Sequence, residues 1–324
     1  MAKPRIAIVG LGLIGSSIGL ALSREAREFE IVGHDKSNAA AGQARKLQAV
    51  DKTDWNLINA CDGAGLIILA LPLGAIRETM QALAGELAAG AVVIDTASVK
   101  APVQAWADEL LPAGAAFVGT NPIVASDQTG GAAARADLFD GRMWAICPSP
   151  STDERAVKTA ADLAARLGAR PLFLDATEHD GMAAAVEQLP ALASMALLTS
   201  AVSQPAWREM RKLAGGQFES STRLVSSDPR VFSDAMLHST EQVVRWIDSF
   251  IDNMAAWRDL IAAGDSEAID NAFAEAASQR AHWLNQRSKG DWDEDTARPY
   301  ERPSMLLSWL GLSRLGERRQ RDKK

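Results

Sequence analysis

The stretch Ile6-Ala7-Ile8-Val9-Gly10-Leu11-Gly12-Leu13-Ile14-Gly15 decides the fold of the first half of this 324-residue chain. Its β-branched apolar start predicts a buried strand, and the pattern G-x-G-x-x-G follows at once. Apolar residues then continue at helical spacing, so the stretch predicts a strand, a tight turn and a helix. In such a unit Gly10 permits the turn, and Gly15 lets the helix pack closely against the strand.

The same turn predicts a site for a dinucleotide. Gly12 lets the backbone approach a pyrophosphate, and the start of the helix at Leu13 and Ile14 directs N–H groups and a positive dipole end toward phosphates. Leu71 and Pro72 follow a later strand of the same half, at a strand end over which a nicotinamide ring often lies. We therefore expect these residues to contact a nicotinamide dinucleotide.

An acidic residue sits where such a site requires one. A second short strand, residues 30–34, ends at Asp35, which lies 25 residues after Gly10. This spacing is close to that of the carboxylate that binds the adenosine ribose hydroxyls, and the alternative is a solvated loop acid. Asp35 repels a 2′-phosphate and favours NAD, whereas Lys36 and Ser37 keep NADP as the alternative.

Composition indicates a soluble two-domain protein of a reducing compartment. Apolar residues make up 47% and charged residues 23% of the chain, and a net charge of −7 gives no reason to expect nucleic acid. Cys61 and Cys147 are far apart and follow the pattern of buried thiols, not of a disulfide framework or a metal site. The chain enters its first strand directly and has no apolar run of 18 residues, so we expect no signal peptide, no membrane span and a cytoplasmic location.

Residues 1–174 are predicted to form a Rossmann-type domain. Strand-like apolar runs alternate with helical segments, which is typical of βαβ units and a parallel, doubly wound sheet. The later strands are expected at 66–70, 91–95, 116–118, 143–147 and 171–174, and helices at 75–88, 101–110 and 153–167.

Residues 175–287 are predicted to be all helical. No strand-like run occurs between Glu178 and Trp283, and Ala-, Leu- and Met-rich segments repeat with helical period at 178–203, 229–262 and 267–287. Pro190 should kink or break the first of them. The high apolar content favours a dimerisation domain, and packing on the first domain is the alternative.

The tail 288–324 has a different composition. Residues 314–324 carry six Lys or Arg against two acids. Docking of this tail on its own dimer is the favoured interpretation, and a membrane-surface helix is the alternative.

Polar residues follow the predicted strands at the edge where open α/β sheets bind ligands. Ser98 comes shortly after the strand 91–95 and either faces the cofactor and substrate or caps the helix that starts near Ala101. Asn121 follows the next strand and points to the same edge. We expect Ser98 and Asn121 to carry the chemistry.

Together with downstream motifs, these residues resemble the prephenate and arogenate dehydrogenases of tyrosine biosynthesis. The resemblance covers about residues 4 to 265 and rests on five motifs. They are Asp95 to Lys100, the block from Gly119 to Gly141, His179-Asp180, Leu189-Pro190 and Thr222-Arg223. It implies a Rossmann-type domain, a helical dimerisation domain and a homodimer. It also implies an NAD(P)-dependent oxidative decarboxylation of a carboxylated cyclohexadienol such as prephenate or arogenate.

The resemblance also implies roles for individual residues. Arg223 matches the arginine that grips the substrate side-chain carboxylate, which a guanidinium binds bidentately, and an ion pair with Glu219 is the alternative. Ser98 matches a serine near the nicotinamide and the substrate hydroxyl. His179 and Asp180 match a His-Asp pair that either contacts substrate or serves for capping and interdomain bonding.

Two family histidines are replaced in this chain. After the strand 116–118 the family has Gly-x-His-Pro-Met, and Asn121 stands at its histidine, which accepts the hydrogen bond of the substrate hydroxyl. The family's Ser-His-Leu-Pro-His is here Glu187-Gln188-Leu189-Pro190-Ala191, so Gln188 replaces the second histidine in the substrate pocket. An amide accepts a hydrogen bond but has no useful basicity.

Three functions remain open from the sequence. The first is a prephenate or arogenate dehydrogenase in which Asn121 orients the hydroxyl while water or another group takes the proton. The second is a dehydrogenase of another carboxylated substrate, such as a β-hydroxy acid. Dehydrogenases of β-hydroxy acids usually carry a catalytic lysine on the first helix of the second domain, and the absence of lysine between Lys158 and Lys212 counts against that substrate. The third is a cofactor-binding homologue without turnover.

Overall fold

The computed structural model describes residues 3–24, 28–124, 128–226, 229–290 and 292. Contacts divide the chain into two units, one up to Asp180 and one from Gly181. The sequence predicted the division a little earlier, between residues 174 and 175. Most of the tail 288–324 lies outside the described residues, and so does the docking expected of it.

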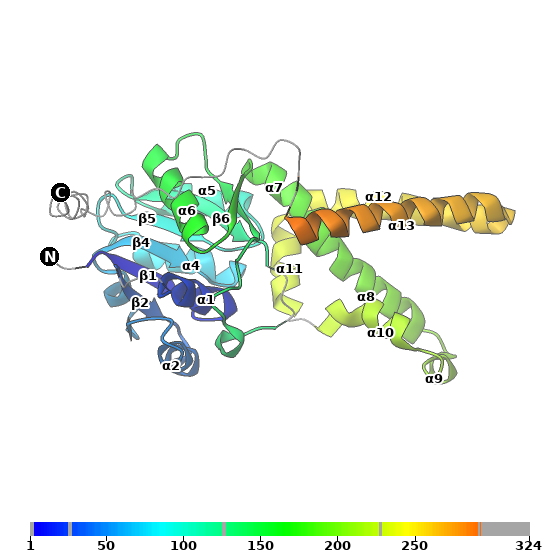
Figure 1. The fold of residues 1–324 in the computed structure, drawn as a ribbon, viewed down its shortest axis with the longest axis horizontal. Helices are drawn as coiled ribbons and strands as arrows, with labels where there is room; N and C mark the ends of the chain where they lie inside the picture. The colour runs from blue at the N-terminus through cyan, green and yellow to red at the C-terminus, as the bar shows by residue number, and fades with distance from the viewer. Residues whose placement is uncertain (1–2, 25–27, 125–127, 227–228, 291, 293–324) are drawn as a thin grey trace, which may run out of the picture. The chain divides into compact units, whose positions relative to one another are not determined.

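The first unit is built on an eight-stranded sheet in the order β3-β2-β1-β4-β5-β6-β7-β8 (Figure 1). Its strands are β1 Arg5–Val9, β2 Glu30–His34, β3 Lys52–Thr53, β4 Ala64–Leu69, β5 Val92–Asp95, β6 Ala116–Pro122, β7 Met143–Cys147 and β8 Arg170–Phe173. Its helices are α1 Leu13–Leu22, α2 Asn38–Lys46, α3 Leu57–Cys61, α4 Leu73–Leu83, α5 Ala101–Leu110, η1 Gly131–Ala133, α6 Glu154–Arg166 and the start of α7 Ala176–Ala183. The strand order reverses between β1 and β4, and ligands of open α/β sheets bind at such a reversal, beyond the carboxyl ends of the strands.

This arrangement confirms the Rossmann-type fold. Each predicted strand is present, and the helix predicted at 101–110 has the bounds of α5. The strand β3 was not predicted because it has only two residues, which pair with Val32 and Gly33 at the sheet edge. A run of two residues carries no periodic signal, so only the tertiary partner reveals it.

The sheet is not parallel throughout, which corrects one expectation. Strand β6 pairs in parallel with β5 but antiparallel with β7. Antiparallel neighbours need no crossover, whereas a parallel pair needs a connection that returns to the starting edge of the sheet. The described part of the connection 123–142 holds only the short helix η1. The chain therefore turns back, and β7 runs in the opposite direction.

All the regular secondary structure in the described residues of the second unit is helical, as predicted. It contains the end of α7, η2 Ala184–Gln188, α8 Leu189–Val202, α9 Trp207–Met210, α10 Gly216–Thr222, η3 Arg223–Ser226, α11 Pro229–His238, α12 Thr240–Ala263 and α13 Ser266–Lys289. The irregularity expected from Pro190 is present, because η2 is a π-helical turn directly before it. Pro190 has no N–H to donate to the preceding turn, so the helix widens there. The single helix expected at 229–262 is two helices that meet at Ser239.

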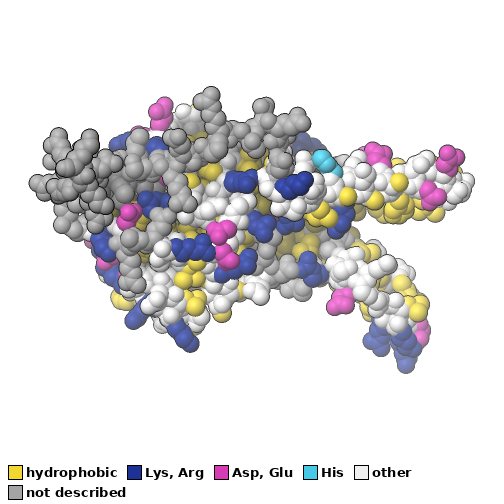
Figure 2. Space-filling view, in the orientation of Figure 1, with side chains coloured by type: hydrophobic (Ala, Val, Ile, Leu, Met, Phe, Trp, Pro, Cys, Tyr) yellow, Lys and Arg dark blue, Asp and Glu magenta, His cyan; other side chains and the backbone are white. Residues whose placement is uncertain are grey.

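The helices α12 and α13 lie side by side as a hairpin (Figure 1). Gly264 ends α12 with a φ of 68°, which glycine adopts without strain, and Asp265 caps α13 through the N–H of Ala268. Figure 2 shows hydrophobic side chains along this hairpin, and Ile251 and Met254 of α12 are among the exposed ones. A large exposed apolar surface of this kind is typical of an interaction surface.

One helical stretch, Ala176–Val202, is long and apolar enough to cross a membrane when judged by length and composition alone. Core helices of soluble proteins meet the same criterion. The stretch also includes the charged residues Glu178, Asp180 and Glu187. The absence of a membrane span therefore stays a prediction.

Both cysteines are buried free thiols, as the sequence predicted. Burial raises the pKa of Cys61 and of Cys147 from 9.0 to about 12. We expect a thiol reagent such as DTNB to label neither residue in the native protein at pH 8 and both after unfolding. Because the folded pKa values lie above the unfolded ones, the stability that this burial preserves below pH 9 should be lost as the pH rises toward 12. Fast native labelling of either thiol would contradict this.

Candidate functional site

The turn between β1 and α1 requires glycine at two positions. Gly10 has a φ of 95°, and a Cβ built on it would lie 2.2 Å from the carbonyl oxygen of Ala70. A Cβ on Gly15 would lie 1.9 Å from the carbonyl oxygen of Gly10. The N–H of Gly10 also donates to His34 O at 2.8 Å. The contact of Gly10 with the end of β4 and that of Gly15 with the turn therefore exclude any larger residue at these two positions.

Gly12 differs from these two glycines because no contact with the described chain requires a glycine at this position. A Cβ on Gly12 would meet no atom of the described chain within 4 Å. The helix α1 that follows has no side-chain N-cap. The N–H groups at its first turn, from Leu13 onward, therefore border an open space that suits an anion. This cradle fits the phosphates of a dinucleotide.

Asp35 lies directly against the glycine turn. Its Oδ2 accepts from the N–H of Leu11 at 2.8 Å, and its Oδ1 accepts from the N–H of Ser37 at 2.7 Å. Ser37 in turn caps α2 through the N–H of Ala40. The acid at the end of β2 is thus held beside the cradle, where an adenosine ribose follows the phosphates in this fold.

The nicotinamide side of the turn is bordered by the end of β4. The Cδ2 of Leu71 lies 3.0 Å from the position of a Cβ on Gly10. Pro72 occupies the N-cap position of α4 and is exposed. Leu71 and Pro72 therefore flank the glycine turn at the strand-order reversal, where the sequence predicted them.

A segment that the sequence left without a role also covers the turn. Gly131 in η1 is buried, and a Cβ on it would lie 2.8 Å from the carbonyl oxygen of Leu11. The hydroxyl of Ser17 in α1 accepts from the N–H of Arg135 at 3.1 Å. The Gly130-Gly131 pair was the signal that could have found this contact, because adjacent glycines permit close backbone approach.

A buried ion pair joins the ends of β5 and β6. The Nζ of Lys100 donates to Asp95 Oδ2 and to the carbonyl oxygen of Thr120, the latter at 2.7 Å, and both charged side chains are 0% exposed. Asp95 Oδ1 accepts from the N–H of Thr120 at 3.0 Å. The backbone of Thr120 is therefore held at both its carbonyl and its N–H, and this fixes the position of Asn121 beside it.

A second buried network contains three residues predicted for the site. Asn121, His179 and Asp180 are 5%, 4% and 2% exposed. The amide nitrogen Nδ2 of Asn121 lies 3.2 Å from His179 Nε2, and His179 Nδ1 lies 2.9 Å from Asp180 Oδ1. Asp180 also accepts from the N–H groups of Lys100 at 2.6 Å and Ala101 at 2.9 Å.

Asp180 therefore caps α5, so capping, the alternative role of Ser98, is not found. The N-cap position of α5 is Lys100, which has no side-chain cap of its own. A carboxylate from a residue 80 positions later binds its first N–H groups instead. Ser98 is half-buried in the loop after β5 and is left to another role.

The second unit holds the other two predicted substrate residues. Gln188 is 2% exposed, its Oε1 accepts from the hydroxyl of Ser239 at 2.9 Å, and its Nε2 has no hydrogen-bond partner among the described residues. Arg223 is exposed at the junction of α10 and η3, which packs on α8. The hydroxyl of Ser194 in α8 donates to Ser221 O at 2.6 Å and so fixes the end of α10 near Arg223.

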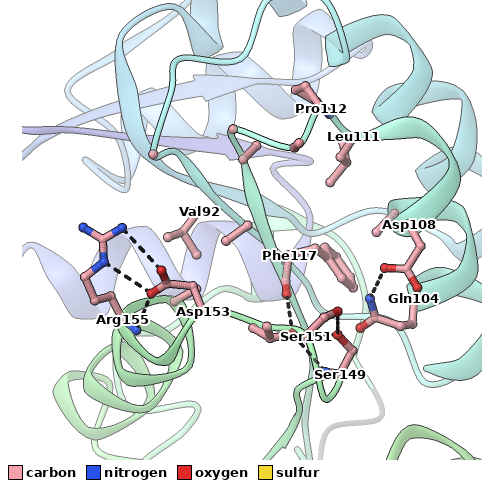
Figure 3. Close-up of a pocket in the computed structure, with 18 residues that line it drawn as sticks. Val92, Gln104, Asp108, Leu111, Pro112, Phe117, Ser149, Ser151, Asp153 and Arg155 are labelled. Carbon is pink, nitrogen blue, oxygen red and sulfur yellow. Dashed lines mark hydrogen bonds and ion pairs between the residues drawn. The ribbon is translucent and has the colours of Figure 1, made fainter.

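A cavity of about 360 Å³ lies at the opposite edge of the sheet, beside the amino ends of β5 and β6 (Figure 3). Its wall is tied by internal bonds, from Gln104 Nε2 to Asp108 Oδ1 and from Arg155 to Asp153. None of the predicted site residues lines it. The candidate functional site is therefore the carboxyl edge, where the cradle and the buried networks lie.

Comparison with known proteins gives one family for both units. A family model described as "Prephenate dehydrogenase, nucleotide-binding domain" matches residues 18–172, and one described as "Prephenate dehydrogenase, dimerization domain" matches residues 175–275. A prephenate dehydrogenase of Bacillus subtilis is 29% identical over 290 residues, which are 89% of this chain and 78% of that protein. A cyclohexadienyl dehydrogenase of Zymomonas mobilis is 28% identical over 277 residues, 85% of this chain and 94% of that protein.

The fold recurs in solved structures. A prephenate dehydrogenase of A. aeolicus, crystallised with hydroxyphenyl propionate and NAD+, has a TM-score of 0.80 and 24% identity, covering 87% of this chain and 99% of that chain.

A relative with a different substrate name is a 4-amino-4-deoxyprephenate dehydrogenase of Streptomyces pristinaespiralis. It is 28% identical over 182 residues, 56% of this chain and 57% of that protein.

The glycine turn gives a matched pair of variants. Gly12→Val should leave the free energy of unfolding nearly unchanged, because its Cβ meets no described atom within 4 Å, but should weaken dinucleotide binding at least ~10-fold by filling the cradle. Gly15→Ala should destabilise the fold by at least ~2 kcal/mol through overpacking. Urea unfolding and calorimetric titration measure the two effects. Equal dinucleotide affinity in Gly12→Val and wild type would contradict the assignment of the cradle.

Proposed function

Because the chain belongs to the prephenate dehydrogenase family, we propose that it is an NAD-dependent dehydrogenase that oxidatively decarboxylates a cyclohexadienyl dicarboxylate, prephenate or arogenate. The observation that carries this proposal is the open cradle at Gly12 beside the acid Asp35, on a chain whose two units both match that family. A dehydrogenase needs such a dinucleotide site next to a substrate pocket. Loss of CO2 and hydride makes the ring aromatic, which drives the reaction.

NAD is the cofactor that these residues suit. The first turn of α1, with Leu13 and Ile14, would hold the pyrophosphate, and the free lone pairs of Asp35 would accept the ribose hydroxyls. The same carboxylate disfavours a 2′-phosphate, so NADP is the weaker choice. When bound, the nicotinamide accepts the hydride of the substrate carbon. Leu71, Pro72 and Ser98 would border that ring.

We propose individual roles in substrate binding for Arg223, Gln188, His179 and Asp180. The guanidinium of Arg223 suits bidentate binding of a carboxylate. The unpaired Nε2 of Gln188 is a buried donor, and leaving it unpaired costs about 1–3 kcal/mol, so an acceptor on the substrate would relieve that cost. Ser98 and Asn121 would contact the reacting end of the substrate, with His179 and Asp180 behind them.

Asn121 favours a second candidate substrate. The amide has no useful basicity, so it gives no general-base help to a hydroxyl substrate. In 4-amino-4-deoxyprephenate, the substrate named for one relative, an amine takes the place of that hydroxyl. Once the ammonium form has released its proton to solvent, the neutral amine has a strongly donating lone pair and needs no further proton removal to expel hydride. Its N–H groups can donate to the amide oxygen. This amine is the alternative substrate of the same reaction.

The direct test is turnover with NAD. Purified protein should form NADH, followed at 340 nm, on addition of prephenate, arogenate or 4-amino-4-deoxyprephenate. Asn121→His should raise kcat/KM for prephenate ~10²–10⁴-fold, because it supplies the missing base, while NAD affinity stays within twofold. The unaltered NAD affinity serves as the control. No NADH from wild type with any of the three substrates would overturn the proposed function.

The Asn121→His variant also separates the two substrates. If prephenate is native, wild type should already turn it over faster than the amine. If the amine is native, the histidine should lower its kcat/KM while raising that of prephenate. The ratio of kcat/KM for prephenate to kcat/KM for the amine, measured on each protein at the same pH, decides the choice.

We further propose a cytoplasmic homodimer formed through the exposed apolar side of the α12–α13 hairpin. The family model of the second unit is described as a dimerization domain. Sedimentation at micromolar concentration should give about twice the chain mass of 34.6 kDa. Ile251→Asp with Met254→Asp should shift the protein to monomer, whereas Asp252→Lys on the same helix should not. A monomeric wild type, or a dimer unaffected by the double change, would contradict this interface.

A further inference from the structure

The protonation of His179 follows from its two partners. Asp180 meets three N–H groups with its two oxygens, from Lys100, Ala101 and the ring nitrogen Nδ1, so it acts as an acceptor toward the ring. The amide nitrogen of Asn121 has only donors, so Nε2 must accept from it. This arrangement corresponds to the tautomer with the proton on Nδ1, whose Nε2 lone pair is directed at Asn121.

This tautomer decides which atom Asn121 offers to a ligand. A carboxamide can present its oxygen or its nitrogen by turning over, and the choice is set by its hydrogen-bond partners. Here Nδ2 is bound to His179, and no described residue donates to Oδ1. Position 121 therefore presents a hydrogen-bond acceptor and withholds its donors.

We infer that His179 and Asp180 are positioning residues that fix the Asn121 amide as an acceptor, and that the substrate group bound at position 121 is a hydrogen-bond donor on the reacting carbon, a hydroxyl or an amine. The inference rests on the proposed function for its activity readout. It explains how a chain without the family histidine still defines the polarity of its site. His179 acts here through Asn121, because its Nε2 accepts from that amide.

A double-mutant cycle tests the positioning role. His179→Leu removes the acceptor that holds Nδ2, so the amide can turn over, and kcat/KM should fall about tenfold, the worth of one hydrogen bond of ~1.4 kcal/mol. In an Asn121→Ala background no amide remains to be oriented. There His179→Leu should change kcat/KM less than threefold. An equal loss in both backgrounds would overturn the inference, because a structural or proton-accepting role does not depend on the amide.

The conservative variant His179→Gln supplies the matched control. Its amide oxygen can accept from Asn121 Nδ2 in place of Nε2, so kcat/KM should stay within threefold of wild type. A glutamine has no basic nitrogen, so a loss as large as that of His179→Leu would point to His179 as a base and overturn the positioning role. NAD affinity should stay within twofold in all variants, which separates these effects from damage to the cofactor site.

The tautomer can be read without turnover. Nitrogen-15 spectra of the imidazole rings distinguish a protonated from a bare nitrogen, and the chain has four histidines, so His179→Gln identifies the signal by its disappearance. The expected form at neutral pH has the proton on Nδ1 and none on Nε2. A proton on Nε2 would overturn the inference. Because this readout needs no substrate, it decides the tautomer even if wild type turns over no substrate and the proposed function fails, or if a cycle variant does not fold.

Discussion

The buried ion pair between Asp95 and Lys100 is the constraint on which the geometry of the site depends. Both side chains are fully buried, and removal of one partner from such a pair typically costs about 3–5 kcal/mol. Desolvation makes a buried pair a poor source of stability, so its role is better sought in the positions that it fixes. Lys100 binds the carbonyl of Thr120 while Asp95 binds its N–H, so β6 is fixed next to the end of β5.

The second network depends on the first through neighbouring residues. Asn121 directly follows Thr120, and Asp180 accepts from the N–H of Lys100. The two networks are therefore connected at two points, through residues 120–121 and through Lys100. The single carboxylate of Asp180 both caps α5 and orients the ring of His179. Loss of Asp180 would therefore affect a helix end and the polarity of the site together. The polar groups of this edge behave as one unit, and effects of single changes within it are not additive.

The sequence predicts most of the backbone part of the site and little of the side-chain part. Gly15 is demanded by a contact with Gly10 in the same β-turn-α unit, and Gly10 by its φ of 95° as well as by its approach to Ala70, so the local pattern reveals both. Asp180 capping α5 involves residues 80 positions apart, and no local pattern encodes it. From local type and spacing alone, Ser98 was the alternative candidate for that cap. The antiparallel β7 escaped prediction because strand direction depends on the path of a loop and not on the strand residues.

The two ends of the proposed reaction differ in what specifies them. The cofactor end is built from backbone, namely the N–H groups at the start of α1 and the close contacts of Gly10 and Gly15. A larger residue at either glycine would therefore disrupt the fold as well as the site. The substrate end is built from side chains whose hydrogen-bonding direction is set by partners, as with Asn121 and Gln188. A side chain of this kind can be replaced without cost to the sheet, and replacement of a histidine by an amide changes what the site accepts. This difference in construction accounts for a chain that keeps the G-x-G-x-x-G motif while two polar residues proposed for substrate binding have diverged.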